Sequence, residues 1–178
     1  MGFLKPHKML AIILATLFMV YSIPSVTAQA RLRATQPQLQ ALFIKKITKY
    51  VLRPDERRIS AIRPVTVAAI RPRPMARFFN RPDGFRLTRW PSADCDVLFI
   101  GNVNPRIMAA VLNKVKGKPI LTIGRSPEFL KMGGMINLVQ TGPRFKLQVN
   151  VCAAREAGLT ISSKLLKLSE IYCGETPQ

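Results

Sequence analysis

The side chains that carry most enzymatic chemistry are scarce in this sequence of 178 residues. Its only histidine is His7, which lies in an N-terminal segment that we expect to be removed after export. The remaining chain then has no imidazole, which excludes Ser-His-Asp triads, Cys-His nucleophile pairs and histidine-ligated metal sites. We therefore predict that the protein is not an enzyme and needs no metal or other cofactor.

Two carboxylates form the most suggestive pair that remains. Asp94 and Asp96 flank Cys95, and at this spacing both would point to the same face of a strand. Such a pair could act in acid–base catalysis or bind Ca²⁺, but we expect both carboxylates to face solvent ahead of the next strand. Their negative charges would disfavour the Cys95 thiolate, which argues against a reactive nucleophile.

One loop has the position of a ligand-binding loop. Gly101, Asn102 and Asn104 lie between the apolar run Val97–Gly101 and a predicted helix that begins at Pro105. The carboxyl end of a parallel strand, beside a helix N-terminus, is where doubly wound sheets bind anions and other ligands. The GxGxxG and Walker patterns are both missing, so a plain strand–helix turn remains the simpler alternative to a ligand loop.

The chain has three cysteines, Cys95, Cys152 and Cys173. In an oxidising compartment they allow one disulfide and one free thiol, with three alternative pairings. Equally, all three could be small buried apolar residues. Their spacing matches no zinc-binding pattern.

The first 28 residues have the three parts of a secretory signal. Lys5 and Lys8 form a basic head, Met9–Ile23 is uncharged and apolar, and small residues precede the predicted cleavage site after Ala28. Cleavage after Ala30 is the alternative. An uncleaved membrane anchor is a further interpretation, but this apolar stretch is shorter than the roughly 20 residues that span a bilayer. We therefore expect the mature protein in the periplasm.

The charge balance is strongly basic, with 28 Lys and Arg against 9 Asp and Glu and a net charge of +19. In the cytosol this excess would suggest nucleic acid as a partner. Export makes lipid headgroups and cell-wall carboxylates the natural anions instead, so we predict no nucleic-acid partner. The basic residues are spaced rather than clustered, which favours a solvated basic surface; a patch for an anionic membrane or cell-wall surface is the alternative.

The first predicted element is a helix that follows Pro37 and closes before Pro54. Lys45, Lys46 and Lys49 lie outside its apolar face. That face is formed by residues at helical spacing: Leu39, Leu42, Phe43, Ile47, Tyr50 and Val51.

The rest of the chain alternates between predicted strands and helices. Apolar runs predict strands at 65–70, 85–90, 97–101, 119–123, 135–139 and 145–151, the last two joined as a hairpin. Capping residues predict helices after Asn104, Ser126 and Ser162, with a further helical segment at 153–157, and Gly133-Gly134 supply a turn. This order predicts a single α/β domain: a mainly parallel sheet with an antiparallel edge hairpin and helices on both faces.

Four segments in this order resemble the YfiR-like family of exported bacterial proteins. They are Ala41–Pro54, Cys95–Gly101, Lys118–Val139 and Phe145–Ser169. The residues that carry most of the resemblance form one motif: Gly133, Gly134, Met135, Ile136, Asn137, Asn150, Ser162 and Ser163.

The resemblance implies a periplasmic α/β protein, often a homodimer, without catalytic residues. It further implies a regulator that binds the periplasmic domain of an inner-membrane diguanylate cyclase and restrains it, so that loss of the regulator raises cyclic di-GMP and favours biofilm. The alternative function is a periplasmic sensor or carrier that binds an anionic small molecule or cell-wall fragment near Gly101–Pro105.

The sequence departs from the family pattern at two places. Arg53-Pro54 stands where a Trp-Pro is usual. Cys95 matches a family cysteine, but the first strand lacks its usual partner, so we favour a Cys152–Cys173 disulfide with Cys95 free or as the alternative partner. The resemblance places the domain at 37–173, after a flexible segment 29–36 and before a flexible tail 174–178.

Overall fold

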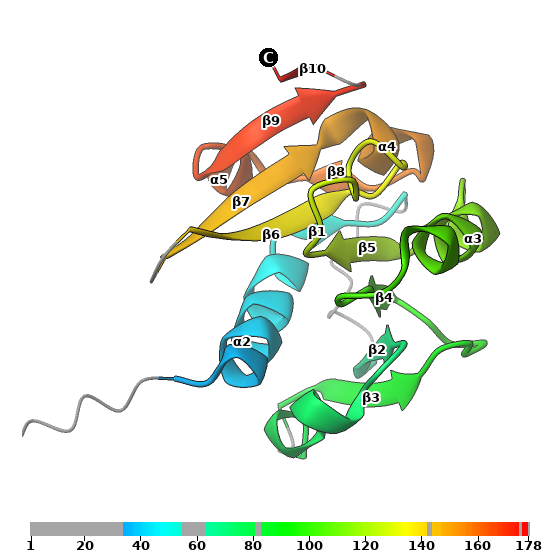
Figure 1. Cartoon of the computed structure of the whole chain (residues 1–178), viewed down its shortest axis with the longest axis vertical. Coiled ribbons are helices and arrows are strands. Elements are labelled where there is room, and N and C mark those ends of the chain that lie inside the picture. The colour runs from blue at the N-terminus through cyan, green and yellow to red at the C-terminus, as the bar shows by residue number, and fades with distance from the viewer. Residues whose placement is uncertain (1–33, 55–62, 81–82, 142–143, 175, 178) are drawn as a thin grey trace, which may run out of the picture. The chain divides into compact units, whose positions relative to one another are not determined.

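An eight-stranded sheet forms the centre of the fold (Figure 1). From edge to edge its strands are β10 (Thr176–Pro177), β9 (Ser169–Cys173), β7 (Arg144–Asn150), β6 (Ile136–Thr141), β5 (Leu121–Gly124), β4 (Val97–Phe99), β2 (Val65–Ala69) and β3 (Phe85–Arg89). Strands β2 to β6 are all parallel to one another. Strand β7 turns back antiparallel to β6 and is parallel to β9. The predicted single-domain α/β class is confirmed, although β9 and β10 continue the sheet beyond the hairpin.

The computed structural model describes residues 34–54, 63–80, 83–141, 144–174 and 176–177, all within one unit, Ala34–Gln178. The predicted signal, with its cleavage sites at Ala28 and Ala30, lies outside these residues. Among the described helices, none combines the length and the apolar character that crossing a bilayer requires.

Alternate residues of the central strands enter two separate hydrophobic cores, one on each face of the sheet. Val97 and Phe99 of β4 belong to the core beneath helix α2 (Gln36–Thr48), the 3₁₀ helix η1 (Arg73–Phe78), α4 (Val151–Glu156) and α5 (Ser163–Leu166). Leu98 belongs to the core beneath α3 (Pro105–Val115). Because both faces of β4 are buried, its sequence is continuously apolar, as in other parallel sheets covered by helices.

Helix α2 ends earlier than predicted, and its buried face only partly overlaps the predicted one. The structure ends it at Thr48 because Val51–Leu52 form a short strand, β1, which pairs with β8 (Thr160–Ile161). Its buried residues are Gln40, Ala41, Ile44, Ile47 and Thr48. The predicted face was therefore right in part: Ile47 and Val51 are buried, whereas Leu42 and Tyr50 are 46% and 39% exposed.

Two further segments differ from the expectation. Residues 126–133 form successive turns instead of a short helix, because the Phe129 ring lies against Gly124 and Gly134 and occupies the place where either glycine would carry a Cβ. Helix α5 ends at Leu166, which leaves Leu168 78% exposed, and the chain continues as β9. Strand β9 was missed because it has no clear apolar alternation and is only partly buried.

A buried carboxylate joins the amino ends of β2 and β4. Asp96 is 1% exposed and accepts hydrogen bonds from the Arg63 guanidinium (2.8 and 2.9 Å) and from the Thr66 backbone N–H (2.9 Å). Arg53 also donates to it. The expectation of two solvent-facing carboxylates was thus wrong for Asp96, because two arginines and a backbone N–H hold its carboxylate inside the protein. It was right for Asp94, whose side chain is 73% exposed.

Replacing Asp96 with Asn should destabilise the fold much more than the same change at Asp94. Removing one partner of a buried ion network costs roughly 3–5 kcal/mol; we expect about 3 kcal/mol, since both arginines reach solvent. The Asp94→Asn control removes only a 4.0 Å contact between exposed groups, so its free energy of unfolding should stay within about 0.5 kcal/mol of the wild type. Urea denaturation of the three proteins measures the difference, and equal values for the two variants would contradict the role given to Asp96.

Candidate functional site

The strand order places a topological switch point between β2 and β4. Read from the edge, the parallel strands follow the order β3-β2-β4-β5-β6. The connection that leaves β2 passes through η1 on one face of the sheet, and the connection that leaves β4 passes through α3 on the other. In open α/β sheets, ligands bind at the carboxyl ends of the two strands where the connections diverge in this way.

A cleft of about 230 Å³ lies at these carboxyl ends. The segments that follow β2, β4 and β5 contribute Arg71, Gly101–Val103 and Arg125 respectively. The first turns of α2 close one side with Gln36, Pro37 and Gln40, and η1 contributes Pro74 and Met75. The lining therefore combines an apolar wall with a few polar groups, as small-molecule sites generally do.

Three polar side chains of the cleft have no partner among the described residues, although Gln36 donates to Gln140 Oε1. Neither Arg71 nor Arg125 forms an ion pair with another described residue. The Nε atom of Arg125 is buried without a hydrogen bond. Gln40 is 7% exposed, and its side-chain amide forms no hydrogen bond within the described part of the chain. Buried polar groups in this state cost stability unless a ligand or solvent molecule satisfies them.

The structure brings together only part of the predicted ligand loop. Gly101 and Asn102 line the cleft. Asn104 does not, because its Oδ1 accepts the Arg106 backbone N–H (2.9 Å) and caps α3. Sequence reasoning missed Arg71, Arg125 and Gln40. The two arginines could have been found by applying the strand-end rule to every parallel strand, since Arg125 directly follows β5 and Arg71 lies two residues after the end of β2.

Most of the chain is similar to a known protein family. Residues 37–170 match the family described as YfiR/HmsC-like. The chain belongs to the YfiR/HmsC-like family. This family is regulatory and periplasmic rather than catalytic. Among the described residues there is also no group of three His, Cys, Asp or Glu side chains placed to hold a metal ion.

The residues that carry the YfiR/HmsC-like motif hold turns and helix ends together. Asn137 is fully buried, and its amide donates to the Ser126 carbonyl (3.0 Å) and to Gln148 Oε1 (3.1 Å). Gly133 has a φ of +86°, which side-chain-bearing residues rarely adopt. Ser162 Oγ accepts the Lys164 backbone N–H (3.3 Å) at the start of α5.

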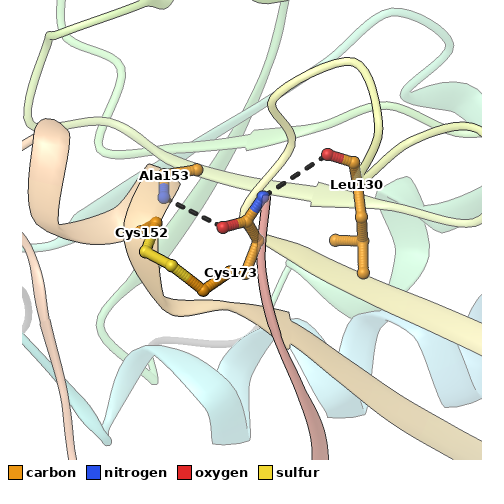
Figure 2. Close-up of a disulfide and its surroundings, with 5 residues drawn as sticks. Leu130, Cys152, Ala153 and Cys173 are labelled. Carbon is orange, nitrogen blue, oxygen red and sulfur yellow. Dashed lines mark hydrogen bonds between the residues drawn. A yellow bond between two sulfur atoms is a disulfide. The ribbon is translucent and has the colours of Figure 1, made fainter. Parts of the chain in front are cut away.

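The remaining motif residues have similar roles. Asn150 Oδ1 accepts the Ala153 N–H (3.0 Å) and caps α4, while its Nδ2 reaches the Leu130 carbonyl at 3.4 Å (Figure 2). Met135 donates its backbone N–H to Thr122 Oγ1 (3.0 Å), and both it and Ile136 are buried. Ser163 is the first residue of α5. Gly134, Ile136 and Asn150 are thus buried parts of the scaffold, as is most of the motif.

The cysteines divide into one bonded pair and one free thiol. Cys152 and Cys173, the pair that we favoured, form a disulfide that joins the first turn of α4 to the end of β9 (Figure 2), with 5.1 Å between their Cα atoms. Cys95 is free and buried, and burial raises the pKa of its thiol from about 9.0 to about 11. Desolvation, rather than the neighbouring carboxylates that we had invoked, is the main reason why its thiolate is disfavoured.

This division predicts three different results from thiol labelling followed by mass spectrometry. The native protein at pH 8 should take up no alkyl group, because the Cys95 thiol is buried and protonated. Denaturant alone should allow one group, and denaturant with a reductant should allow three. Labelling of native Cys95 should rise only as the pH approaches 11. Rapid labelling of the native protein at pH 8, or two free thiols in denaturant alone, would contradict the assignment.

Proposed function

We propose that this chain is a periplasmic regulator that binds the periplasmic segment of an inner-membrane diguanylate cyclase and restrains it. The match of residues 37–170 to the YfiR/HmsC-like family carries this proposal. The lack of histidine outside the predicted signal, together with the scaffold roles of the motif residues, supports a function exerted by contact rather than by catalysis.

A groove between α2 and η1 is our candidate for the contact surface. It measures about 590 Å³ and is lined by both apolar and basic side chains, among them Leu42, Phe78 and Arg77. Leu42 is 46% exposed, although it lies on a helix whose other face is buried. Apolar side chains that share a groove with a polar rim, as Ala41, Leu42 and Phe78 do here, are typical of a protein-interaction surface.

The charges of the groove favour a partner segment that combines apolar and acidic residues. Lys45 is already engaged, because its Nζ donates to Asp83 (2.5 Å) and to the Phe78 carbonyl (2.5 Å). Arg77 lies over the Phe78 ring at 4.7 Å and has no acidic partner among the described residues. Because the chain carries a net charge of +19, an acidic segment would also be attracted over a longer range.

Deleting the gene in the native host should raise cellular cyclic di-GMP and increase biofilm. The wild-type gene should restore both to the original level. Expression of a Leu42→Asp variant should not restore them, because a charge in the groove would oppose docking of an apolar segment. The measurements are cyclic di-GMP by mass spectrometry and the amount of each variant in the periplasmic fraction.

Leu168→Asp provides the matched control. Leu168 is 78% exposed and lies between α5 and β9, so the same charge introduced there should leave complementation intact. An unchanged cyclic di-GMP level in the deletion strain would overturn the proposed function. Full complementation by Leu42→Asp would overturn the assignment of the groove while leaving the restraint itself intact.

A further inference from the structure

We infer that the cleft at the carboxyl ends of β2, β4 and β5 binds a small organic anion through the guanidinium groups of Arg71 and Arg125 and the side-chain amide of Gln40. The inference does not depend on the partner proposed above, because it rests on the residues of the cleft alone.

The first step is the charge of the cleft. Arg71 follows β2 and Arg125 follows β5, so two cations approach the same space from two strands. No carboxylate of the described residues forms an ion pair with either one. Guanidinium groups bind carboxylates and phosphates through paired N–H donors, which makes an oxyanion the complementary ligand.

The second step is the burial of polar groups that have no partner. Arg125 Nε is buried without a hydrogen bond to any described residue. Gln40 as a whole residue is 7% exposed, and its side-chain amide lines the cleft without a hydrogen bond to the described residues. The buried Asp96, by contrast, accepts hydrogen bonds from Arg63 and Thr66. A buried guanidinium nitrogen without a partner is rare in folded proteins, and one that lines a cleft indicates a site whose ligand supplies the missing acceptor.

The third step is the backbone of the loop after β4. The N–H groups of Gly101, Asn102 and Val103 donate no hydrogen bond to any other described residue. Gly101 leaves room for a ligand to approach the backbone, since the nearest side-chain atom to a Cβ built there is Phe99 Cε1 at 3.5 Å. Free amides at a switch point, beside two guanidinium groups, are suited to the oxygens of an anion.

The size of the cleft limits the ligand. Its volume is about 230 Å³. Pockets for drug-sized ligands are generally larger, at roughly 300–1,000 Å³. Phe99, Met75 and Ile70 supply apolar parts of the lining. The ligand class is therefore a compact carboxylate or phosphate ester with a small apolar part.

The test measures thermal unfolding of the purified chain during titration with inorganic phosphate or with acetate, at constant ionic strength maintained with chloride. A ligand that binds the native state raises the melting temperature in a saturable way. We expect saturation with at least one of the two probes, and the probe that acts distinguishes a phosphate ester from a carboxylate. No saturable rise with either probe would overturn the inference.

Three variants connect the effect to the cleft. Arg71→Gln and Arg125→Gln should each raise the apparent Kd at least tenfold, while Arg73→Gln, which removes an equal charge from exposed η1, should leave it unchanged. An equal loss in all three would indicate binding to the general basic surface and would overturn the assignment.

Gln40→Leu separates binding from folding. Because the amide has no partner in the described part of the chain, an apolar side chain of similar size should keep or raise the melting temperature of the unliganded protein while abolishing the response to the probe. A Gln40→Leu protein that unfolds at a lower temperature and still responds normally would contradict the role given to Gln40.

Discussion

The pairing of β2 with β4 is the contact on which both ends of this fold depend. Val67, Ala68 and Ala69 pair in parallel with Val97, Leu98 and Phe99. At the amino ends, the buried carboxylate of Asp96 holds the backbone of Thr66 and the guanidinium of Arg63, so the register is fixed by an ionic contact as well as by ladder hydrogen bonds. At the carboxyl ends, the connections leave on opposite faces, and the cleft opens between them. One pair of strands thus has a closed polar network at one end and a cleft lined by Arg71 and Arg125 at the other.

The basic residues differ in whether an acidic side chain lies beside them. Sequence spacing left two alternatives, a solvated surface or a dedicated patch. Arg53 and Arg63 form ion pairs with Asp96, and Lys45 donates hydrogen bonds to Asp83 and to the Phe78 carbonyl. Arg71 and Arg125 have no such acidic partner among the described residues, although Arg125 is partly buried. The position of each cation relative to the carboxylates therefore matters more than the net charge.

Much of the fold could be predicted from the sequence because local signals agreed with the tertiary structure. The runs at 97–101 and 119–123 read as strands buried on both faces, and Asn104-Pro105 marked the start of α3 correctly. The face of α2 could be predicted only in part, because burial depends on which strands it covers: Ile44 is buried whereas Leu42 is exposed, and both are equally apolar. Strand β9 gave no signal because it relies on pairing with β7 more than on burial.

Only part of the candidate site could be predicted from the sequence, for a related reason. Gly101 and Asn102 could be found because they follow an obvious strand. Gln40 could not, since a glutamine on a helix normally faces solvent, and only the tertiary structure shows that this one is buried against the cleft. Arg53 likewise gave no sign of its pairing with Asp96, which is distant in sequence. Polar residues that are buried by contacts between distant segments leave no periodic trace in the sequence.

Helix α2 is the element that the cleft and the groove share. Gln36, Pro37 and Gln40 line the cleft, whereas Gln38, Leu42 and Lys45 line the groove on the side toward η1. The 3₁₀ helix η1 is shared in the same way, through Met75 in the cleft and Phe78 in the groove. A ligand that binds Gln40 would therefore contact a helix whose neighbouring turn forms the proposed contact surface. Any difference in the position of α2 between the free and the liganded protein would couple the two sites, and linkage requires that coupling to be reciprocal: a partner in the groove would change ligand affinity by the same factor by which the ligand changes partner affinity.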